Sequence, residues 1–322
     1  MFTKTELEEA AKLVHQYMNP SAQISWLLLE EILGVKTIVK HENHNLTGAF
    51  KVRGGITFID WLTKAHPEVE GIVSATRGNH GQSQAMSAIR AGLSANIYVP
   101  FGNSKEKNDA MAAFGANVIE FGSDFDEAKG EAMRQAELKN WFAVPSFHKE
   151  IVRGVATYAY ELFSAEPDLD AVYVPIGCGS GICGTIVARD ALGLKTKIIG
   201  VVSSEAQSAK LSVEQGRLVE ANSANTFADG LAVRVPVQAA FDIYSKGAER
   251  IIAVSEEEIA SAIRLYFSAT HNASEGAGAA ALAGLMQEKD KMRGKKVAVI
   301  LSGANIDSDM FHTILGGDVP KV

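Results

Sequence analysis

Short apolar runs rich in β-branched residues alternate along the chain with stretches of helical period. The runs cover residues 37–41, 71–76, 95–100, 116–121, 142–146, 171–177, 197–203, 250–255 and 296–303. The stretches between them, such as 79–92 and 255–271, repeat apolar residues at three- and four-residue spacing. Strands buried on both faces read as nearly continuous apolar runs, and a strand–helix–strand order makes them parallel. The pattern predicts an α/β protein with doubly wound, mostly parallel sheets.

The spacing of the runs also predicts two domains. Four runs follow one another closely between residues 71 and 146, which suggests a small domain at 66–146. It would be inserted in a large domain made of 1–65 and 147–322. Ligands of open α/β sheets bind beyond the carboxyl ends of the strands, so the residues that follow each run are the first candidates for a site.

Composition and charge exclude several classes of function. The 322 residues carry a net charge of -7, and the 31 basic residues are dispersed among 38 acidic ones, so we expect no nucleic-acid partner. The charged N-terminal segment lacks the apolar centre of a signal peptide, and no apolar run approaches about 20 residues. We therefore expect a cytoplasmic protein without a membrane partner. Cys178 and Cys183, five residues apart, match neither a disulfide framework nor a zinc site, and we expect both to be small buried side chains.

The strongest local motif is Gly-Cys-Gly-Ser-Gly at 177–181, between a predicted strand and a predicted helix. Glycines let the backbone approach an anion, and the amides of the following helix can bind it, which suggests a phosphate site. With Gly184 the motif also fits a dinucleotide-binding pattern. That pattern needs an acid at the end of the next strand, where Val202 and Ser203 stand instead. A nicotinamide cofactor is thereby disfavoured but stays open, as does a simple tight turn.

A second motif surrounds Lys51, after the run 37–41. Lys51 is expected at the start of a helix, next to Phe50 and among small residues. An enclosed, partly apolar site disfavours the ammonium form of a lysine, as Schiff-base chemistry requires. A solvated lysine beside an arginine explains the same residues, so the motif alone does not decide its role.

Four motifs together resemble one enzyme family. The segment 47–55, TGAFKVRGG, is similar to the lysine motif of the threonine/serine dehydratase and serine racemase family, which is tryptophan-synthase-like and of fold type II. ATRGNHGQ at 75–82, GCGSG at 177–181 and LSGANID at 301–307 resemble the other motifs of that family, in the same order. The resemblance spans residues from about 25 to 307. It implies two sheets, with pyridoxal 5'-phosphate bound in the cleft between a large and a small domain.

The resemblance also implies a role for individual residues. Lys51 would bind the cofactor as a Schiff base and remove the Cα proton of the substrate. The other cofactor contacts implied are Phe50, Asn79, Gly177, Cys178, Gly179, Ser180, Gly181, Gly230, Glu275 and Ser302. The substrate contacts implied are Thr76, Arg77, Gly78, Asn79 and His80. Phe147 follows a predicted strand at the domain crossing, where it could face the substrate side chain.

Two departures from the family and one match to it refine the expected chemistry. Arg77 replaces the serine that serine racemases use as a second acid/base, and an arginine does not give up its proton. Ser302 would meet the pyridine nitrogen with a hydroxyl, which favours prompt loss of a β-leaving group. Val202 or Ser203 stands where the family carries an acid for a cation, so no metal is expected.

These residues predict a lyase of amino-acid catabolism. It would dehydrate and then deaminate a β-hydroxy amino acid such as threonine, serine or phenylserine, giving a 2-oxo acid and ammonia; hydroxyaspartate stays open. An amino-acid racemase on the same scaffold, a NAD-binding oxidoreductase and a catalytically silent ligand-binding protein are the alternatives. The sequence does not reveal an oligomeric state, and a homo-oligomer is compatible with it.

Overall fold

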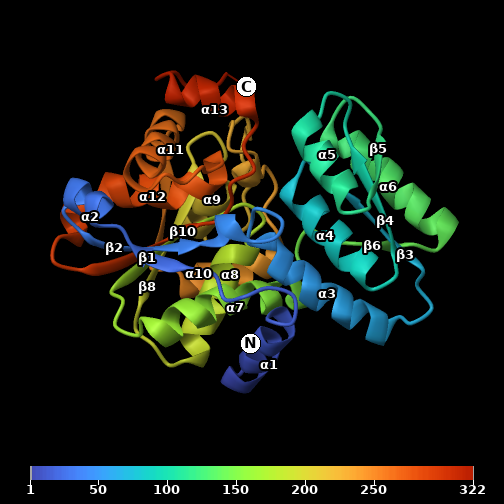
Figure 1. Cartoon of the computed structure of the whole chain (residues 1–322), viewed down its shortest axis with the longest axis horizontal. Coiled ribbons are helices and arrows are strands. Elements are labelled where there is room, and N and C mark those ends of the chain that lie inside the picture. The colour runs from blue at the N-terminus through green and yellow to red at the C-terminus, as the bar shows by residue number, and fades with distance from the viewer. Residues whose placement is uncertain (1, 322) are drawn as a thin grey trace.

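The computed structural model describes residues 2–321 and contains two separate sheets. The six-stranded sheet lies on the left in Figure 1 and the four-stranded sheet on the right. In spatial order the first comprises β1 (Gln23–Ser25), β2 (Lys36–His41), β10 (Lys296–Leu301), β7 (Ala171–Pro175), β8 (Lys197–Ser203) and β9 (Arg250–Val254). The second comprises β5 (Asn117–Glu120), β4 (Ser94–Val99), β3 (Gly71–Ala75) and β6 (Phe142–Ala143).

All strand pairs are parallel except β1 with β2. The predicted fold class, a doubly wound and mostly parallel α/β protein, is confirmed. The short antiparallel strand β1 was not predicted, because three residues are too few to show a period. The predicted run 142–146 forms a strand over two residues only, and the rest of it leads into the next helix.

Helices cover both faces of the six-stranded sheet. They are α1 (Lys4–Val14), α2 (Leu27–Leu33), α7 (Lys149–Ala165), α8 (Ser180–Ala191), α9 (Ser208–Gln215), α10 (Gln238–Gly247), α11 (Glu256–Thr270), α12 (Gly276–Glu288) and α13 (Ser308–Leu315), with 3-10 turns η1 (Glu42–His44), η2 (Asp229–Leu231) and η3 (Lys289–Met292). Successive residues of a buried strand enter opposite cores: Val172 and Val174 pack with α7 and α8, and Tyr173 packs with α11 and α12. This alternation explains why these strands are apolar at nearly every position.

The four-stranded sheet carries α4 (Asn79–Arg90), α5 (Lys105–Ala113) and α6 (Phe125–Lys139). Between the two sheet units runs α3 (Lys51–Ala65), which contacts both α4 and α7. Glycines permit this close packing. A Cβ on Gly55 would lie 2.3 Å from the Ser83 hydroxyl of α4, and one on Gly154 of α7 would lie 2.1 Å from the Arg53 carbonyl oxygen. The helix that begins at Lys51 is therefore fixed against both units.

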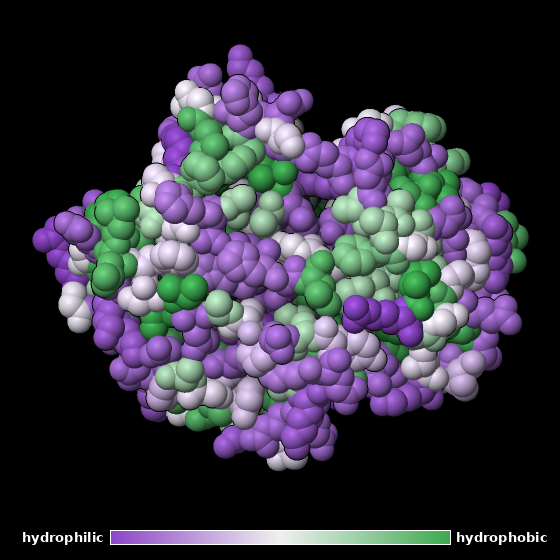
Figure 2. All heavy atoms as spheres, viewed as in Figure 1, coloured by the Kyte–Doolittle hydropathy of each residue, from purple (hydrophilic) through white to green (hydrophobic). Residues whose placement is uncertain are grey.

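The surface is notched between α13 and the unit of the four-stranded sheet, as Figure 2 shows. Apolar side chains gather over α2, where Leu27, Leu28 and Ile32 are exposed. Within residues 2–321, no helix has the length and apolar character needed to cross a membrane. The strands of the smaller sheet fall between residues 71 and 143, while the domain boundaries at 65/66 and 146/147 remain predictions.

Candidate active site

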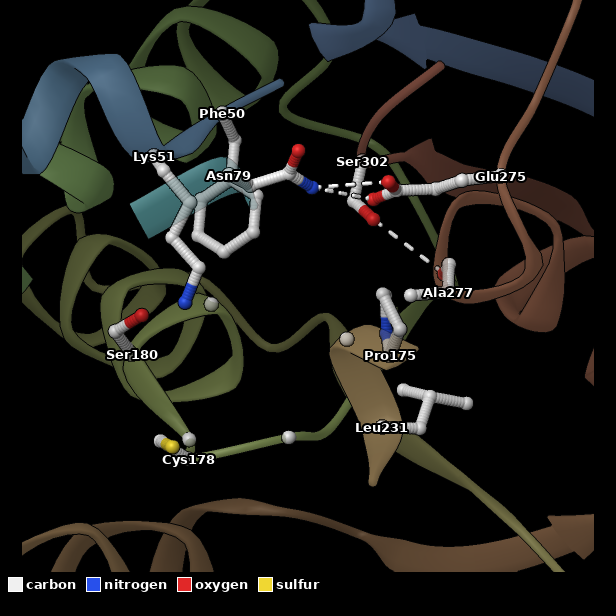
Figure 3. Close-up of a pocket in the computed structure, with 14 residues that line it drawn as sticks. Phe50, Lys51, Asn79, Pro175, Cys178, Ser180, Leu231, Glu275, Ala277 and Ser302 are labelled. Carbon is white, nitrogen blue, oxygen red and sulfur yellow. Dashed lines mark hydrogen bonds between the residues drawn. The ribbon is translucent and has the colours of Figure 1, made fainter. Parts of the chain in front are cut away.

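One pocket gathers the motifs at the carboxyl ends of the strands (Figure 3). It encloses about 380 Å³, part of which is open to solvent. Every residue predicted to contact the cofactor lines it: Phe50, Lys51, Asn79, Gly177, Cys178, Gly179, Ser180, Gly181, Gly230, Glu275 and Ser302. Three further lining residues, Pro175, Leu231 and Ala277, were not predicted. Each is close in sequence to a predicted residue, but the motifs identify polar and glycine positions and not the apolar side chains that line the pocket beside them.

Lys51 is the first residue of α3, and its side chain enters the pocket from there. Its amine lies 5.1 Å from the centre of the Phe50 ring and points toward Ser180 in Figure 3. The backbone before it is fixed to the end of β10: the Phe50 amide donates to the Ser302 carbonyl at 3.0 Å, and Ala49 pairs with Gly303. Backbone pairing thus holds Lys51 and Ser302 close together, although they are 251 positions apart in the sequence.

The loop 177–181 forms a cradle at the start of α8. Gly179 has φ +97°, which favours glycine, and a Cβ on Gly177 would lie 2.1 Å from the Gly230 carbonyl oxygen. The hydroxyl of Ser180 is buried and has no hydrogen-bond partner within the described chain. Free amides at a helix N-terminus and an unpaired buried hydroxyl fit a phosphate group.

The two cysteines differ in their surroundings. Cys183 is buried, as expected, and burial raises the pKa of its thiol. Cys178 is only half-buried and lines the pocket, because it lies on the cradle loop itself. The expectation that both would be buried is therefore wrong for Cys178.

Asn79 and Glu275 form a polar contact across the pocket. The side-chain amide of Asn79 donates to both carboxylate oxygens of Glu275, at 2.7 and 2.9 Å, and its carbonyl accepts from Asn305 at 2.7 Å. Burial raises the pKa of Glu275 to about 7, although Asn79 lowers it. At neutral pH the carboxyl group is thus divided between its two protonation states.

Ser302 follows β10 and is almost fully buried. Its hydroxyl donates to the Ala277 carbonyl at 3.4 Å, a long bond that leaves the hydrogen free to turn toward a better acceptor. A ring nitrogen in the pocket would be such an acceptor.

The residues predicted to contact the substrate, apart from Asn79, do not line this pocket. Thr76 and Gly78 are buried in the turn before α4, where the Gly78 amide donates to the Thr76 hydroxyl at 3.2 Å. Burial lowers the pKa of His80 to about 3, and its buried Nε2 has no hydrogen-bond partner within residues 2–321. Arg77 is exposed. Phe147 is half-buried and packs against the main core, and its contact with a substrate stays a prediction.

Polar contacts also join the two sheet units beside the pocket. Lys107 of α5 binds Asp229 with an N–O distance of 2.6 Å. The Ser104 hydroxyl donates to Asp307 at 2.5 Å. Lys107 also lies over Gly78, where a Cβ would be 3.1 Å from its Cδ. No sequence pattern indicated this contact, because Lys107 lies outside the motifs and is separated from Asp229 by 122 positions.

The described chain, residues 2–321, has no cluster of three or more His, Cys, Asp or Glu side chains that could hold a metal ion. His41 instead accepts from the Trp26 indole at 3.0 Å. Ser203, at the position considered for a cation ligand, donates to Glu256 at 2.7 Å.

Comparison with known proteins gives concordant matches. A family model described as pyridoxal-phosphate dependent enzyme matches residues 16–303. L-threonine ammonia-lyase of Thermotoga maritima is 33% identical over 322 residues, 100% of this chain and 80% of that protein. L-threo-3-hydroxyaspartate ammonia-lyase of Saccharomyces cerevisiae is 28% identical over 317 residues, 98% of this chain and 97% of that protein.

Solved structures give the same picture of the fold. The processed form of threonine deaminase isoform 2 from Solanum lycopersicum superposes with a TM-score of 0.90 at 28% identity, covering 98% of this chain and 94% of that one. Maize serine racemase also superposes with a TM-score of 0.90, covering 98% and 97% of the two chains. Its identity is only 23%, so it supports the shared fold alone.

Proposed function

The chain belongs to the pyridoxal-phosphate dependent enzyme family, and we propose that Lys51 carries its cofactor and acts as its base in β-elimination. The reaction removes water and then ammonia from a β-hydroxy amino acid and yields a 2-oxo acid. The observation that carries the proposal is the placement of Lys51, the cradle 177–181 and Ser302 around one pocket. Each has the chemistry that one part of the cofactor requires.

The pocket residues fit the cofactor part by part. The amides of the cradle and the Ser180 hydroxyl would bind its phosphate. Phe50 would pack beside the ring, Ser302 would face the ring nitrogen, and Asn79 would approach the ring hydroxyl. When bound, pyridoxal phosphate withdraws electrons from the amino acid attached to it and so makes the Cα–H bond acidic.

Lys51 would take the Cα proton of the substrate. As that bond breaks, its electron pair forms a double bond to Cβ, and the β-hydroxyl leaves with a proton as water. The released enamine tautomerises to an imine, and one water molecule hydrolyses the imine to the 2-oxo acid and ammonia. A racemase needs a second acid/base on the opposite face, and Arg77 cannot serve as one.

Threonine and serine are the substrates we propose first. The 33% identical relative is named for threonine, and the 28% identical yeast protein for hydroxyaspartate, so an acidic side chain belongs in the test. Phenylserine stays in the test panel, because Phe147 is half-buried against the core and not enclosed by it.

The test compares wild type with Lys51→Ala and with Lys64→Ala. Lys64 lies on the same helix, exposed and paired with Asp60, so its variant controls for loss of a lysine. We expect wild type and Lys64→Ala to show the cofactor's visible absorbance band and to release 2-oxo acid. Lys51→Ala should lack the band and lose activity by at least about a thousandfold, as for a nucleophile or base removed outright.

Retention of both band and activity in Lys51→Ala would refute the proposed role. Chiral analysis of recovered serine separates elimination from racemisation. NAD binding without cofactor absorbance would favour an oxidoreductase, and colour without ammonia release would favour a silent binding protein.

A further inference from the structure

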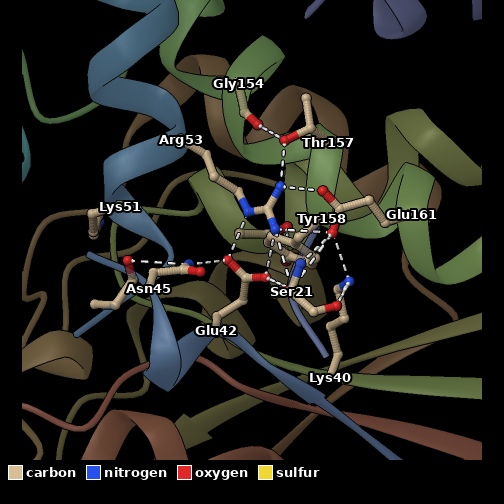
Figure 4. Close-up of polar contacts among 12 residues, drawn as sticks. Ser21, Lys40, Glu42, Asn45, Lys51, Arg53, Gly154, Thr157, Tyr158 and Glu161 are labelled. Carbon is tan, nitrogen blue, oxygen red and sulfur yellow. Dashed lines mark hydrogen bonds and ion pairs between the residues drawn. The ribbon is translucent and has the colours of Figure 1, made fainter. Parts of the chain in front are cut away.

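A buried cluster of charges lies behind the Lys51 segment, centred on Arg53 (Figure 4). The Arg53 guanidinium binds both oxygens of Glu42, at 2.7 and 3.0 Å, and both oxygens of Glu161, at 2.6 and 2.9 Å. It also donates to the hydroxyls of Thr157 and Ser21, at 2.9 and 3.1 Å. The side chains of Arg53 and Glu42 are fully buried, and that of Glu161 is 8% exposed.

Lys40 completes the cluster. Its ammonium group, fully buried, binds Glu161 at 2.7 Å and the Ser21 carbonyl at 2.9 Å. Burial opposes the charge of Glu161, but Arg53 and Lys40 hold its pKa at about 2. Burial lowers the pKa of Lys40, although Glu161 and Glu42 raise it. Two basic side chains thus face two carboxylates, and His15 also contacts Glu161 at 2.8 Å.

Stability alone is a weak reason for such a cluster. Removing four charges from water carries a large desolvation cost, and well-packed apolar residues often serve a core as well or better. The cluster instead fixes the orientation of its members, because the planar guanidinium donates hydrogen bonds only along its fixed N–H axes. Arg53 thereby sets the relative positions of α3, α7, η1 and the segment before β1.

The cluster contacts both ends of the segment 43–52, which carries Lys51. Glu42 and Arg53 pair across this segment. Within the segment, the Asn45 side chain donates to Glu42 at 2.6 Å, and the Asn45 carbonyl accepts from the Gly48 amide at 2.8 Å. On its other side, the Gly48 carbonyl accepts from the Ala304 amide at 2.8 Å. The loop is therefore held from both sides.

We propose that the Arg53–Glu42–Glu161–Lys40 cluster, acting through Asn45, is a positioning device that fixes the Lys51 backbone so that its amine reaches the cofactor. None of these residues touches the pocket, so each acts through another. The proposal rests on the proposed role of Lys51. A small misplacement of a reacting group can cost about a hundredfold in rate.

Three variants test the proposal. Asn45→Ala disconnects the loop from the cluster and leaves every ion pair in place, so it should fold. Glu42→Gln removes one charge of the cluster itself. The control is Glu288→Gln. Glu288 is a buried carboxylate, 4% exposed, that binds Arg250, Lys291 and Tyr173 at the far end of α12.

Four measurements are made on each variant: the melting temperature, amide hydrogen exchange of residues 45–50 in the apoprotein, the yield of borohydride trapping at Lys51 in the holoenzyme, and kcat with KM. We expect Asn45→Ala and Glu42→Gln to speed exchange at 45–50, to lower trapping, and to reduce kcat by about tenfold or more with KM changed less than about threefold. Glu288→Gln should lower the melting temperature only.

The outcomes separate the two proposals. If Lys51→Ala is inactive while Asn45→Ala and Glu42→Gln match Glu288→Gln in exchange, trapping and kcat, the cluster is merely structural and the positioning role is overturned. If Lys51→Ala keeps its band and activity, the role of Lys51 fails first and the positioning role fails with it. If Glu42→Gln does not fold, Asn45→Ala alone decides.

Discussion

Asn79 and Glu275 meet across the cleft, with the Asn79 amide nitrogen 2.7 and 2.9 Å from the two Glu275 carboxylate oxygens. Asn79 is the first residue of α4, beside the four-stranded sheet, and Glu275 immediately precedes α12, behind the six-stranded one. The bond therefore joins the two units at the pocket itself. Because burial raises the pKa of Glu275 to about 7, its charge depends on pH within the working range.

The first prediction concerns stability of the apoprotein against pH. Folding raises the pKa of Glu275 from 4.5 to about 7, so the folded state holds this proton more tightly than the unfolded state. The stabilisation is complete below about pH 4.5 and is lost as pH rises to about 7. We expect Glu275→Gln to remove a pH dependence of up to about 3 kcal/mol in the free energy of unfolding.

Urea unfolding of wild type and Glu275→Gln at several pH values from 5 to 8 measures this difference. Glu288→Gln is the control, because the pKa of Glu288 lies near 2 despite its burial, and its titration falls below that window. Parallel curves for wild type and Glu275→Gln between pH 5 and 7 would contradict the assignment.

The sequence predicted much of the pocket, for a physical reason. Lys51, Asn79, the loop 177–181 and Ser302 each directly follow a buried strand or begin the next helix, and parallel strands bring such positions to one edge. Side chains whose partners are distant in sequence were not predictable. Arg53 is bonded by residues from three other segments, and Lys107 reaches Asp229 across 122 positions. The direction of the Phe147 side chain was also hard to predict, because a residue after a strand can face either the cleft or the core.

The second prediction concerns the cradle. Gly179→Ala places a Cβ at φ +97° and 2.7 Å from the Ala240 Cβ, so the loop must shift. We expect cofactor affinity to fall by at least about tenfold, since an alanine in the left-handed region alone costs about 1–2 kcal/mol. Gly193→Ala is the matched control, with φ +66° at the other end of α8 and no atom within 4 Å of the added Cβ.

Cofactor titration of both apoproteins, followed by absorbance, gives the comparison. Gly193→Ala should lose about 1 kcal/mol of stability yet bind the cofactor as wild type does. Equal losses of affinity in the two variants would show that strain in α8, not the shape of the cradle, sets cofactor binding.

The third prediction concerns the bond between Lys107 and Asp229. Burial disfavours the charge of Lys107, but Asp229 raises its pKa above the ordinary value. Lys107→Met keeps the aliphatic stem over Gly78 and removes the charge that joins the two units. The pair is only partly buried, with side chains 12% and 40% exposed, so we expect a loss of about 1 kcal/mol, seen as a roughly fivefold higher KM.

Lys105→Met is the control for Lys107→Met. Lys105 lies on the same helix and pairs with Asp109 on the open surface, so its variant should leave KM unchanged. Asp229→Asn should reproduce the Lys107→Met result, and the double variant should add little to either. Additive effects in the double variant would mean that the two residues act separately.

The fourth prediction concerns Arg77. Its side chain is exposed and has no partner among residues 2–321, and it stands two residues before Asn79 in the loop that leads into α4. An exposed guanidinium in the loop before α4 is suited to the carboxylate that every amino-acid substrate carries. We expect Arg77→Ala to raise KM by about fivefold to tenfold for threonine and serine alike, with kcat changed far less, because the contact is equal in ground and transition states. Arg90→Ala, at the other end of α4, should change neither KM nor kcat.

Arg77→Ser introduces the residue that serine racemases carry at this position. Chiral analysis of serine incubated with this variant therefore asks whether Arg77 suppresses racemisation. An unchanged KM in Arg77→Ala would place this side chain outside the binding of substrate, and the carboxylate would then rest on the amides at the start of α4 alone.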